Sequence, residues 1–217
     1  VLETRRPDLV LVHGDTTTAL SCALSAFYRR VRVGHVEAGL RTFDLSSPYP
    51  EELNRQGVDL LADYCFAPTD LAADNLFREG KKAEAVWVTG NTVIDALRTT
   101  VSAEYSSRVL TWVGSSRFIL FTAHRRENHG DRMRDMFHAV KRLAEEVDVK
   151  VVFPVHLNPN VRSLAHEILG GAKNVLLVDP LGVFEFHNVM ARCTLVLTDS
   201  GGVQEEAPSL GKPVLVM

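Results

Sequence analysis

Cysteine is scarce in this sequence, and long apolar runs are missing. The three cysteines, Cys22, Cys65 and Cys193, are far apart, and each lies in an apolar stretch. This pattern favours reduced core residues over a disulfide framework or a metal site. No window approaches 18 consecutive apolar residues, and no basic-then-apolar leader is visible. We therefore expect a soluble cytoplasmic protein without a membrane partner.

An excess of basic residues is also missing. The chain has 24 Lys and Arg against 27 Asp and Glu, a net charge of −3, and no long basic run. Nucleic acid and anionic membranes are therefore not expected partners. The histidines show no His-x-x-x-His spacing, so no metal site is predicted. The sequence has no G-x-G-x-x-G motif after a visible strand and no P-loop, so it does not indicate a nicotinamide or ATP cofactor.

Short β-branched runs alternate with helical patterns along the 217 residues, of which 46% are apolar and 24% charged. Continuous apolar strands between helices predict an α/β fold whose parallel sheets are covered on both faces. The expected strands are 8–12, 31–36, 64–67, 85–89, 118–122, 151–155, 175–179, 194–198 and 213–217. The expected helices are 17–30, 51–62, 70–79, 93–102, 132–147, 161–169, 183–191 and 204–209.

The Ser-rich stretch 102–116 is the one expected boundary, and we expect it to be less ordered. It separates two Rossmann-like domains, 1–105 and 116–217, which we expect to face a cleft. The chain starts at Val1 and stops at a strand that no crossover helix follows. We therefore expect both domains to be incomplete at the termini.

Charged and small residues follow strand after strand. Asp15 and Glu37 follow the first two strands, and His124 and Asp199 follow strands of the second half. Open α/β sheets bind ligands outside the carboxyl ends of their strands. Loops after strands are commonly polar, so one such residue indicates little. Their concentration in both halves predicts a cleft that carries out chemistry.

The segment 195–215 is the most informative part of the chain. An apolar run ends in Asp199, Ser200 and two glycines follow, and we expect a helix to begin at 204 with acids in its first turn. Free N–H groups at such a helix start bind anions, and Gly201 and Gly202 allow a phosphate to approach the backbone. Acceptors such as Glu206 suit sugar hydroxyls. An ordinary strand–turn–helix corner with solvated glutamates is the alternative.

Three acidic residues in the first half are candidate proton-transfer groups. Burial raises a carboxyl pKa into a useful range for acid–base work. Asp15 is equally well interpreted as the N-cap of the next helix. Glu37 has no obvious structural task, which favours function. Glu51 and Glu52 follow Pro50, where acids commonly just complement the helix dipole.

The segment that follows the strand 118–122 is a candidate anion site. Arginine pairs with phosphate through two N–H groups, and His124 beside Arg125 and Arg126 suits a departing diphosphate. A solvated basic turn is the alternative. His156 after the next strand is as compatible with a strand-end histidine as with a site residue.

Six short segments occur in a fixed order. They are His13-Gly-Asp-Thr-Thr-Thr, His35-Val-Glu-Ala-Gly-Leu-Arg-Thr, Pro50-Glu-Glu-Leu-Asn-Arg, Thr89-Gly-Asn-Thr-Val-Ile-Asp, His124-Arg-Arg-Glu-Asn and Asp199-Ser-Gly-Gly-Val-Gln-Glu-Glu. Together they resemble the non-hydrolysing UDP-N-acetylglucosamine 2-epimerases over nearly the whole chain. The resemblance implies the two-domain fold of the B-type glycosyltransferases. It also implies cofactor-free interconversion of UDP-N-acetylglucosamine and UDP-N-acetylmannosamine for cell-surface polysaccharides, by a homodimer.

The resemblance also implies residue roles. Asp15, Glu37 and Glu51 would be the acid–base carboxylates, and His124 would contact UDP during its elimination through a 2-acetamidoglucal intermediate. The implied nucleotide contacts are Ser200, Gly201 and Gly202 for phosphate, Glu206 for ribose and Phe186 for uracil. A second, activating UDP-N-acetylglucosamine would involve Arg125, Glu127 and His156.

Three other activities remain open at this point. A UDP-sugar glycosyltransferase of the same fold would share the Ser-Gly-Gly segment and Glu206 but would need an acceptor. A hydrolysing epimerase would release free N-acetylmannosamine. A nucleotide-sugar-binding fragment would bind without turnover. Asp15, Glu37 and Glu51 together favour the non-hydrolysing epimerase.

Overall fold

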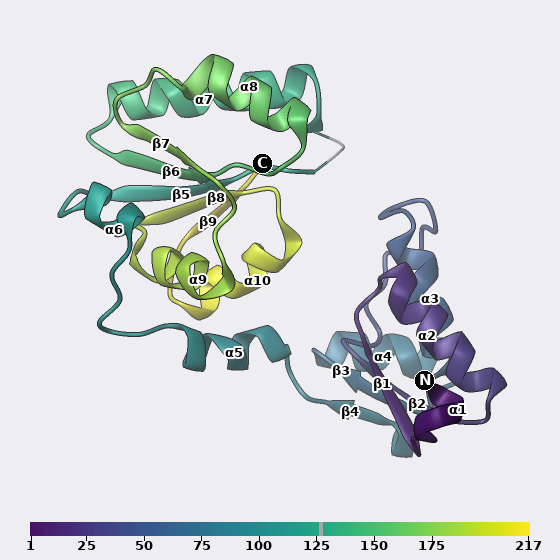
Figure 1. Cartoon of the computed structure of the whole chain (residues 1–217). Coiled ribbons are helices and arrows are strands. Elements are labelled where there is room, and N and C mark those ends of the chain that lie inside the picture. The colour runs from purple at the N-terminus through teal and green to yellow at the C-terminus, as the bar shows by residue number, and fades with distance from the viewer. Residues whose placement is uncertain (126–127) are drawn as a thin grey trace. The chain divides into compact units, whose positions relative to one another are not determined.

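The structure is a computed structural model that describes residues 1–125 and 128–217. It contains two compact units, Val1–Thr92 and Val93–Met217 (Figure 1). The division lies upstream of the stretch 102–116. That stretch was expected to be less ordered, but part of it forms helix α6, Arg108–Val113. The Ser107 hydroxyl caps α6 by accepting a hydrogen bond from the Leu110 N–H group at 3.3 Å.

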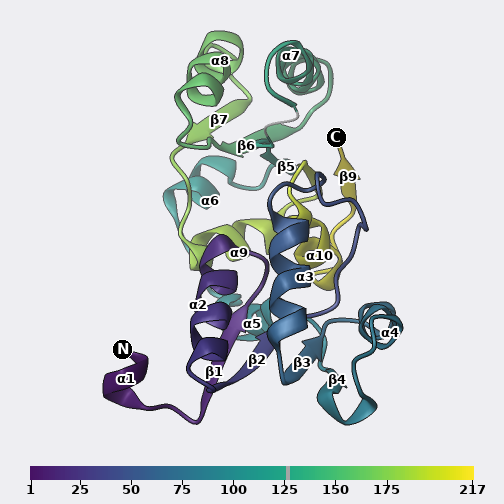
Figure 2. The same cartoon turned by 90° about the vertical axis from the view of Figure 1, so that its right-hand side faces the viewer.

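The first unit is built on a parallel sheet of order β1-β2-β3-β4. The strands are β1 Leu9–His13, β2 Arg32–Val36, β3 Tyr64–Ala67 and β4 Val86–Val88. The helices are α1 Leu2–Arg5, α2 Thr17–Tyr28, α3 Glu51–Leu61, α4 Asp70–Arg78 and the 3-10 turn η1 Ala83–Ala85. Helices α2 and α3 run side by side (Figure 2). All strand pairs are parallel, so β1, β2 and β3 end at one edge of the sheet.

Only one face of this sheet is covered by the described helices. The core joins Val12, Val33 and Cys65 to small side chains of α2, α3 and α4. On the other face, Leu11 is 60% exposed and Trp87 is 43% exposed. The expectation that both faces are covered is therefore wrong for this unit, because apolar strand residues alone do not specify what packs over them.

The second unit is a parallel sheet of order β7-β6-β5-β8-β9. Its strands are β5 Phe118–Thr122, β6 Lys150–Pro154, β7 Val175–Val178, β8 Leu195–Thr198 and β9 Val214–Val216. Its other helices are α5 Thr92–Thr100, α7 Asp131–Glu146, α8 Pro159–Leu169, α9 Val183–Arg192 and α10 Gly201–Ser209. Helices α7 and α8 cover one face and α9 and α10 the other (Figure 1). Both faces of this sheet are buried, as expected.

Local signals set several helix ends. Thr16 caps α2 and Thr69 caps α4, each through a hydroxyl that accepts a backbone N–H three residues on. The cap of α2 is thus Thr16, and Asp15 is not needed for it. Helix α10 begins at Gly201, not at residue 204 as expected. None of the helices in the described part of the chain is long and apolar enough to span a membrane.

Candidate functional site

Three carboxylates gather at the carboxyl-end edge of the sheet in the first unit. Asp15 follows β1, Glu37 follows β2, and Glu51 is the first residue of α3. The Glu51 charge acts on Asp15 and raises its pKa. A Cβ placed on Gly14 would lie 3.2 Å from Oε2 of Glu37, so the Glu37 carboxylate lies against the residue that precedes Asp15. The structure therefore brings together the three carboxylates that the sequence indicated.

Asp15 is half-buried, with 34% of its side chain exposed. Burial raises the pKa of its carboxyl, and Arg55 opposes this rise from 3.6 Å. The Asn54 side-chain amide donates to the Asp15 carbonyl oxygen at 2.9 Å and fixes the backbone. A carboxylate with a raised pKa and a fixed backbone is suited to accepting and returning a proton.

Glu37 adopts an unusual backbone conformation. Its φ of 72° lies in the left-handed region, which is costly for a residue with a Cβ. Its N–H and that of Ala38 both donate to the Phe66 carbonyl oxygen at 3.0 Å. His13 Nε2 lies 3.5 Å from Glu37 Oε2. The strand end therefore holds Glu37 in a conformation that aims its carboxylate back toward β1.

A buried network beneath this edge was not found by sequence reasoning. His35 lies on β2 with no exposed surface; Nδ1 contacts Asp59 Oδ1 at 2.6 Å and Nε2 contacts the Gly14 carbonyl at 3.0 Å. Asp59 also accepts from the Gly39 N–H and pairs with Arg41. The network ties β2, α3 and the Asp15 loop together. In the sequence, the available signals for this network were a histidine in an apolar strand and an aspartate inside a helix.

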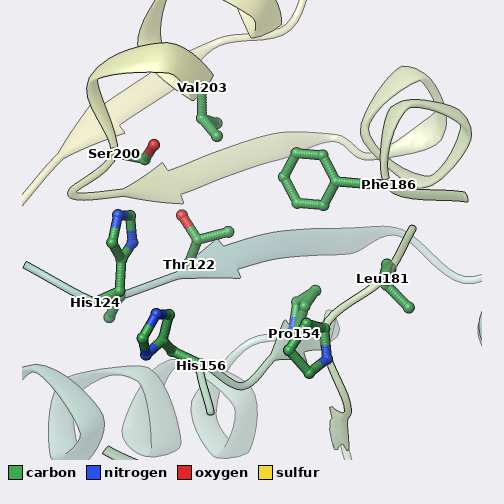
Figure 3. Close-up of a pocket in the computed structure, with 10 residues that line it drawn as sticks. Thr122, His124, Pro154, His156, Leu181, Phe186, Ser200 and Val203 are labelled. Atoms are coloured by element: carbon green, nitrogen blue, oxygen red, sulfur yellow. The ribbon is translucent and has the colours of Figure 1, made fainter. Parts of the chain in front are cut away.

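The second unit carries a pocket of about 220 Å³ at the carboxyl ends of its strands. It is lined by Thr122, Ala123, His124, Pro154, His156, Pro180, Leu181, Phe186, Ser200 and Val203 (Figure 3). The Phe186 ring and the apolar side chains form one end, and His124, His156 and Ser200 form the other (Figure 3). A flat ring fits the first end and an anion the second, which matches the two ends of a nucleotide.

Asp199 organises the histidine end of this pocket. It is 1% exposed and accepts hydrogen bonds from the backbone N–H groups of His124 and Arg125 and from the Asn128 amide. Its Oδ1 lies 3.2 Å from His124 Nδ1. Burial would raise the pKa of Asp199, but the hydrogen bonds from His124, Arg125 and Asn128 lower it to about 2. An ionised Asp199 therefore orients the His124 ring. In the sequence, the position of Asp199 at the end of an apolar strand was the only signal for this role.

The first turn of α10 leaves open space beside its backbone. Ser200 is the N-cap, and its hydroxyl accepts no hydrogen bond from the described helix. A Cβ on Gly201 would meet Arg125 Nη2 at 3.5 Å, and one on Gly202 would meet Glu206 at 3.8 Å, both ordinary contacts. Packing therefore does not require glycine at either position, and without a Cβ the backbone there is open to close approach.

Glu206 and Phe186 lie on neighbouring helices of the second unit. Glu206 Oε2 is 3.6 Å from Nε2 of the buried His187, whose Nδ1 contacts the Thr100 hydroxyl at 2.7 Å. Burial and the Glu205 charge raise the pKa of Glu206. A carboxylate held this way has acceptors for a pair of hydroxyls.

The residues indicated for a second substrate molecule are only partly described. Glu127 lies outside the described residues. His156 stacks on His124 at 5.8 Å between ring centres, inside the same pocket. Among the described residues, no group of three or more His, Cys, Asp or Glu side chains is placed to hold a metal ion.

The two parallel-sheet α/β units have the fold of solved UDP-N-acetylglucosamine 2-epimerases, which is of the B-type glycosyltransferase kind. The family model described as UDP-N-acetylglucosamine 2-epimerase matches residues 1–217. The chain is 59% identical over 213 residues to the UDP-N-acetylglucosamine 2-epimerase of Bacillus subtilis (strain 168), covering 98% of this chain and 56% of that one. The chain belongs to the UDP-N-acetylglucosamine 2-epimerase family.

Solved structures agree with this assignment. The S. aureus MnaA–UDP co-structure matches with a TM-score of 0.96 and 53% identity, covering 99% of this chain and 59% of that chain. The Neisseria meningitidis UDP-GlcNAc 2-epimerase bound to UDP-GlcNAc matches with a TM-score of 0.91 and 45% identity, covering 99% and 60%. The chain thus spans somewhat more than half the length of these relatives.

Proposed function

We propose that this protein interconverts UDP-N-acetylglucosamine and UDP-N-acetylmannosamine at C2 of the sugar. The C1–O bond to UDP breaks while a carboxylate takes the C2 proton, which leaves 2-acetamidoglucal and UDP. A proton then returns to C2 from the opposite face as a diphosphate oxygen of UDP bonds to C1. The scheme uses no cofactor, because neither step is a net oxidation or reduction.

In this proposal the first unit handles protons. Elimination and re-addition on opposite faces require more than one carboxylate, and Asp15, Glu37 and Glu51 supply them. The raised pKa of Asp15 suits a group that must release as well as accept a proton. The convergence of these three carboxylates is the observation that carries the proposal, because a glycosyltransferase has less use for all three.

The second unit is proposed to hold UDP. Ser200, Gly201 and Gly202 would contact the diphosphate, Glu206 the ribose hydroxyls and Phe186 the uracil. His124, oriented by Asp199, would stabilise the negative charge that develops on the departing diphosphate. The S. aureus relative of matching fold is a UDP co-structure, which supports UDP as a ligand of this protein.

Proton NMR of UDP-N-acetylglucosamine incubated with the protein in D₂O tests the proposal. We expect deuterium at C2 and a second anomeric signal from the manno epimer, with no acceptor added. Asp15→Asn should lower the exchange rate by about 10²- to 10⁴-fold. Asp95→Asn, at a side chain that is 70% exposed, is the control and should exchange at the wild-type rate.

The same spectra separate the competing activities. Free N-acetylmannosamine with UDP would assign the hydrolysing reaction. Intact substrate without deuterium, from a protein that binds UDP, would contradict epimerisation by this chain and leave a glycosyltransferase without its acceptor or a binding function.

Regulation and assembly are part of the proposal. Arg125, Glu127 and His156 would contact a second, activating UDP-N-acetylglucosamine, and the protein would act as a cytoplasmic homodimer. Initial rates from UDP-N-acetylmannosamine with and without added UDP-N-acetylglucosamine test the activation. Equal rates would remove it.

A further inference from the structure

Arg55 lies between two carboxylates that differ sharply in their surroundings. Its Nε donates to Glu52 Oε2 at 2.6 Å, and Nη2 pairs with the same oxygen. Its Nη1 lies 3.6 Å from Asp15 Oδ2. Only 10% of the Arg55 side chain is exposed. One guanidinium therefore joins a buried carboxylate to a candidate acid–base residue.

Glu52 is the fixed partner in this arrangement. Its side chain is fully buried, and it accepts hydrogen bonds from the backbone N–H groups of Thr42 and Phe43 and from the Gln56 amide. Burial would raise the pKa of Glu52, but the hydrogen bonds from Gln56, Thr42 and Arg55 lower it to about 2. Glu52 thus stays ionised near neutral pH and anchors Arg55 in one orientation.

Helix geometry explains why Arg55 reaches Asp15. Glu51, Asn54 and Arg55 are spaced i, i+3 and i+4, so they share one face of α3. Asn54 bonds the Asp15 backbone, and the Glu51 charge acts on the Asp15 carboxylate. This face of α3 therefore presents the Asn54 amide, the Arg55 cation and the Glu51 anion to Asp15.

The electrostatic balance at Asp15 has several contributors. Burial raises the pKa of Asp15, Arg55 lowers it, the Glu51 charge raises it and His35 lowers it. Glu37 lies over Gly14, with His13 beside it. Among the side-chain charges, Arg55 has the largest effect, and it opposes the effect of burial.

We propose that Arg55 is a positioning residue that keeps the Asp15 carboxylate ionised and aligned, and that Glu52 holds Arg55 in place for this task. The contribution to proton transfer rests on the proposed function. The electrostatic part does not, and it can be measured without turnover.

The test is a carboxyl ¹³C NMR titration of Asp15 in the full chain, with the resonance assigned by its loss in Asp15→Asn. In Arg55→Met the Asp15 midpoint should move to higher pH. In Arg55→Lys the Asp15 midpoint should move in the same direction but less. The ammonium keeps the positive charge but cannot reproduce the contacts that three guanidinium nitrogens make with Glu52 and Asp15. Gln56→Leu is the matched control: Gln56 bonds Glu52 Oε1, whereas Arg55 contacts Glu52 Oε2, so the Arg55 contacts remain and the Asp15 midpoint should stay.

Activity gives a second readout. Whichever limb of the kcat–pH profile follows Asp15 should move to higher pH in Arg55→Met and stay in Gln56→Leu. Folded Arg55 variants with a wild-type Asp15 midpoint would overturn the proposal, as would an equal shift in Gln56→Leu. A wild-type chain without epimerase activity that still shows the Arg55-dependent shift would refute the proposed function and leave the role of Arg55 intact.

Discussion

At the residue scale, Gly39 and Gly201 differ in the space that a Cβ atom would have. A Cβ on Gly39 would lie 2.1 Å from the Ala72 carbonyl oxygen, and the residue has a φ of +86°. Gly39 is thus required by close packing. Gly201 is different, because its nearest neighbour would be Arg125 Nη2 at 3.5 Å. The absence of a side chain there serves something other than packing, and ligand binding is the explanation that we propose.

This difference predicts opposite effects on stability and binding for Gly201→Ala. The free energy of unfolding should stay or rise by up to about 1 kcal/mol, because alanine favours a helix over glycine. UDP affinity should fall by at least about tenfold, since the methyl group occupies the phosphate approach. Urea unfolding and calorimetric UDP titration measure the two effects.

Ser209→Ala is the control for Gly201→Ala. Ser209 lies in the same helix, exposed and away from the pocket. It should leave UDP affinity unchanged. Unchanged UDP affinity in Gly201→Ala would refute the phosphate assignment.

Strand position indicated Asp15 and Glu37, which follow β1 and β2, and the family resemblance indicated Glu51, which begins α3. A place in the first helical turn did not by itself distinguish Glu52 from Glu51. Acids in a first helical turn are usually solvated, and only the packing of the 42–43 loop over α3 shows that Glu52 is buried. The contact of Arg55 with Asp15 likewise depends on tertiary structure, although helical spacing places Arg55 and Glu51 on one face of α3.

At the scale of elements, α2 and α4 offer a matched comparison. Both have a threonine N-cap, Thr16 and Thr69, whose hydroxyl accepts a backbone N–H at 3.2 and 3.1 Å. Thr16 directly follows Asp15, whereas Thr69 caps a helix that carries none of the proposed site residues. The two caps make the same kind of hydrogen bond, and only Thr16 is adjacent in sequence to a proposed acid–base residue.

We expect Thr16→Ala and Thr69→Ala to cost about 1 kcal/mol of unfolding free energy each. Only Thr16→Ala should also lower kcat, on the order of tenfold, because a looser helix start displaces Asp15. Urea unfolding and the NMR epimerisation assay give both quantities. Equal kcat losses in the two variants would show that the effect is one of stability alone.

Element boundaries were predicted well where strong signals exist and badly where glycine is ambiguous. Strands β3 and β5 have the expected limits, set by apolar runs. Helix α10 starts three residues early because Gly201 and Gly202 were interpreted as a turn from their low helix propensity. Helix α6 was missed because its serine-rich flanks indicated a loop, although Ser107 is a good N-cap.

At the scale of the whole molecule, each unit has its own core and its own tryptophan. Trp87 on β4 stacks on Phe66 at 5.7 Å in the first unit, and Trp112 on α6 lies 4.7 Å from Lys150 Nζ in the second. The alternation of apolar strands and helices predicted two parallel-sheet units, and this is confirmed. Fluorescence from one tryptophan therefore reports one unit.

This arrangement makes the acid sensitivity of the first unit measurable by itself. The pKa of Glu52 is about 2 in the folded chain against a usual 4.5. Its ionised form therefore stabilises the fold fully above pH 4.5, by about 3 kcal/mol, and this contribution is lost as the pH falls through 2. Glu52→Gln has no such contribution to lose.

In a Trp112→Phe background, Glu52→Gln should lower the urea midpoint of the Trp87 signal at pH 7, and this difference should shrink steadily between pH 4.5 and pH 3. In a Trp87→Phe background, Glu52→Gln should leave the Trp112 midpoint unchanged at every pH, because the described hydrogen-bond partners of Glu52 belong to the first unit. Asp199→Asn should lower the Trp112 midpoint and leave the Trp87 midpoint unchanged, since Asp199, whose pKa is lowered, lies in the second unit. A midpoint difference that stays constant down to pH 3 would mean that the Glu52 charge does not stabilise the fold. A change in both tryptophan signals would mean that the two units unfold as one.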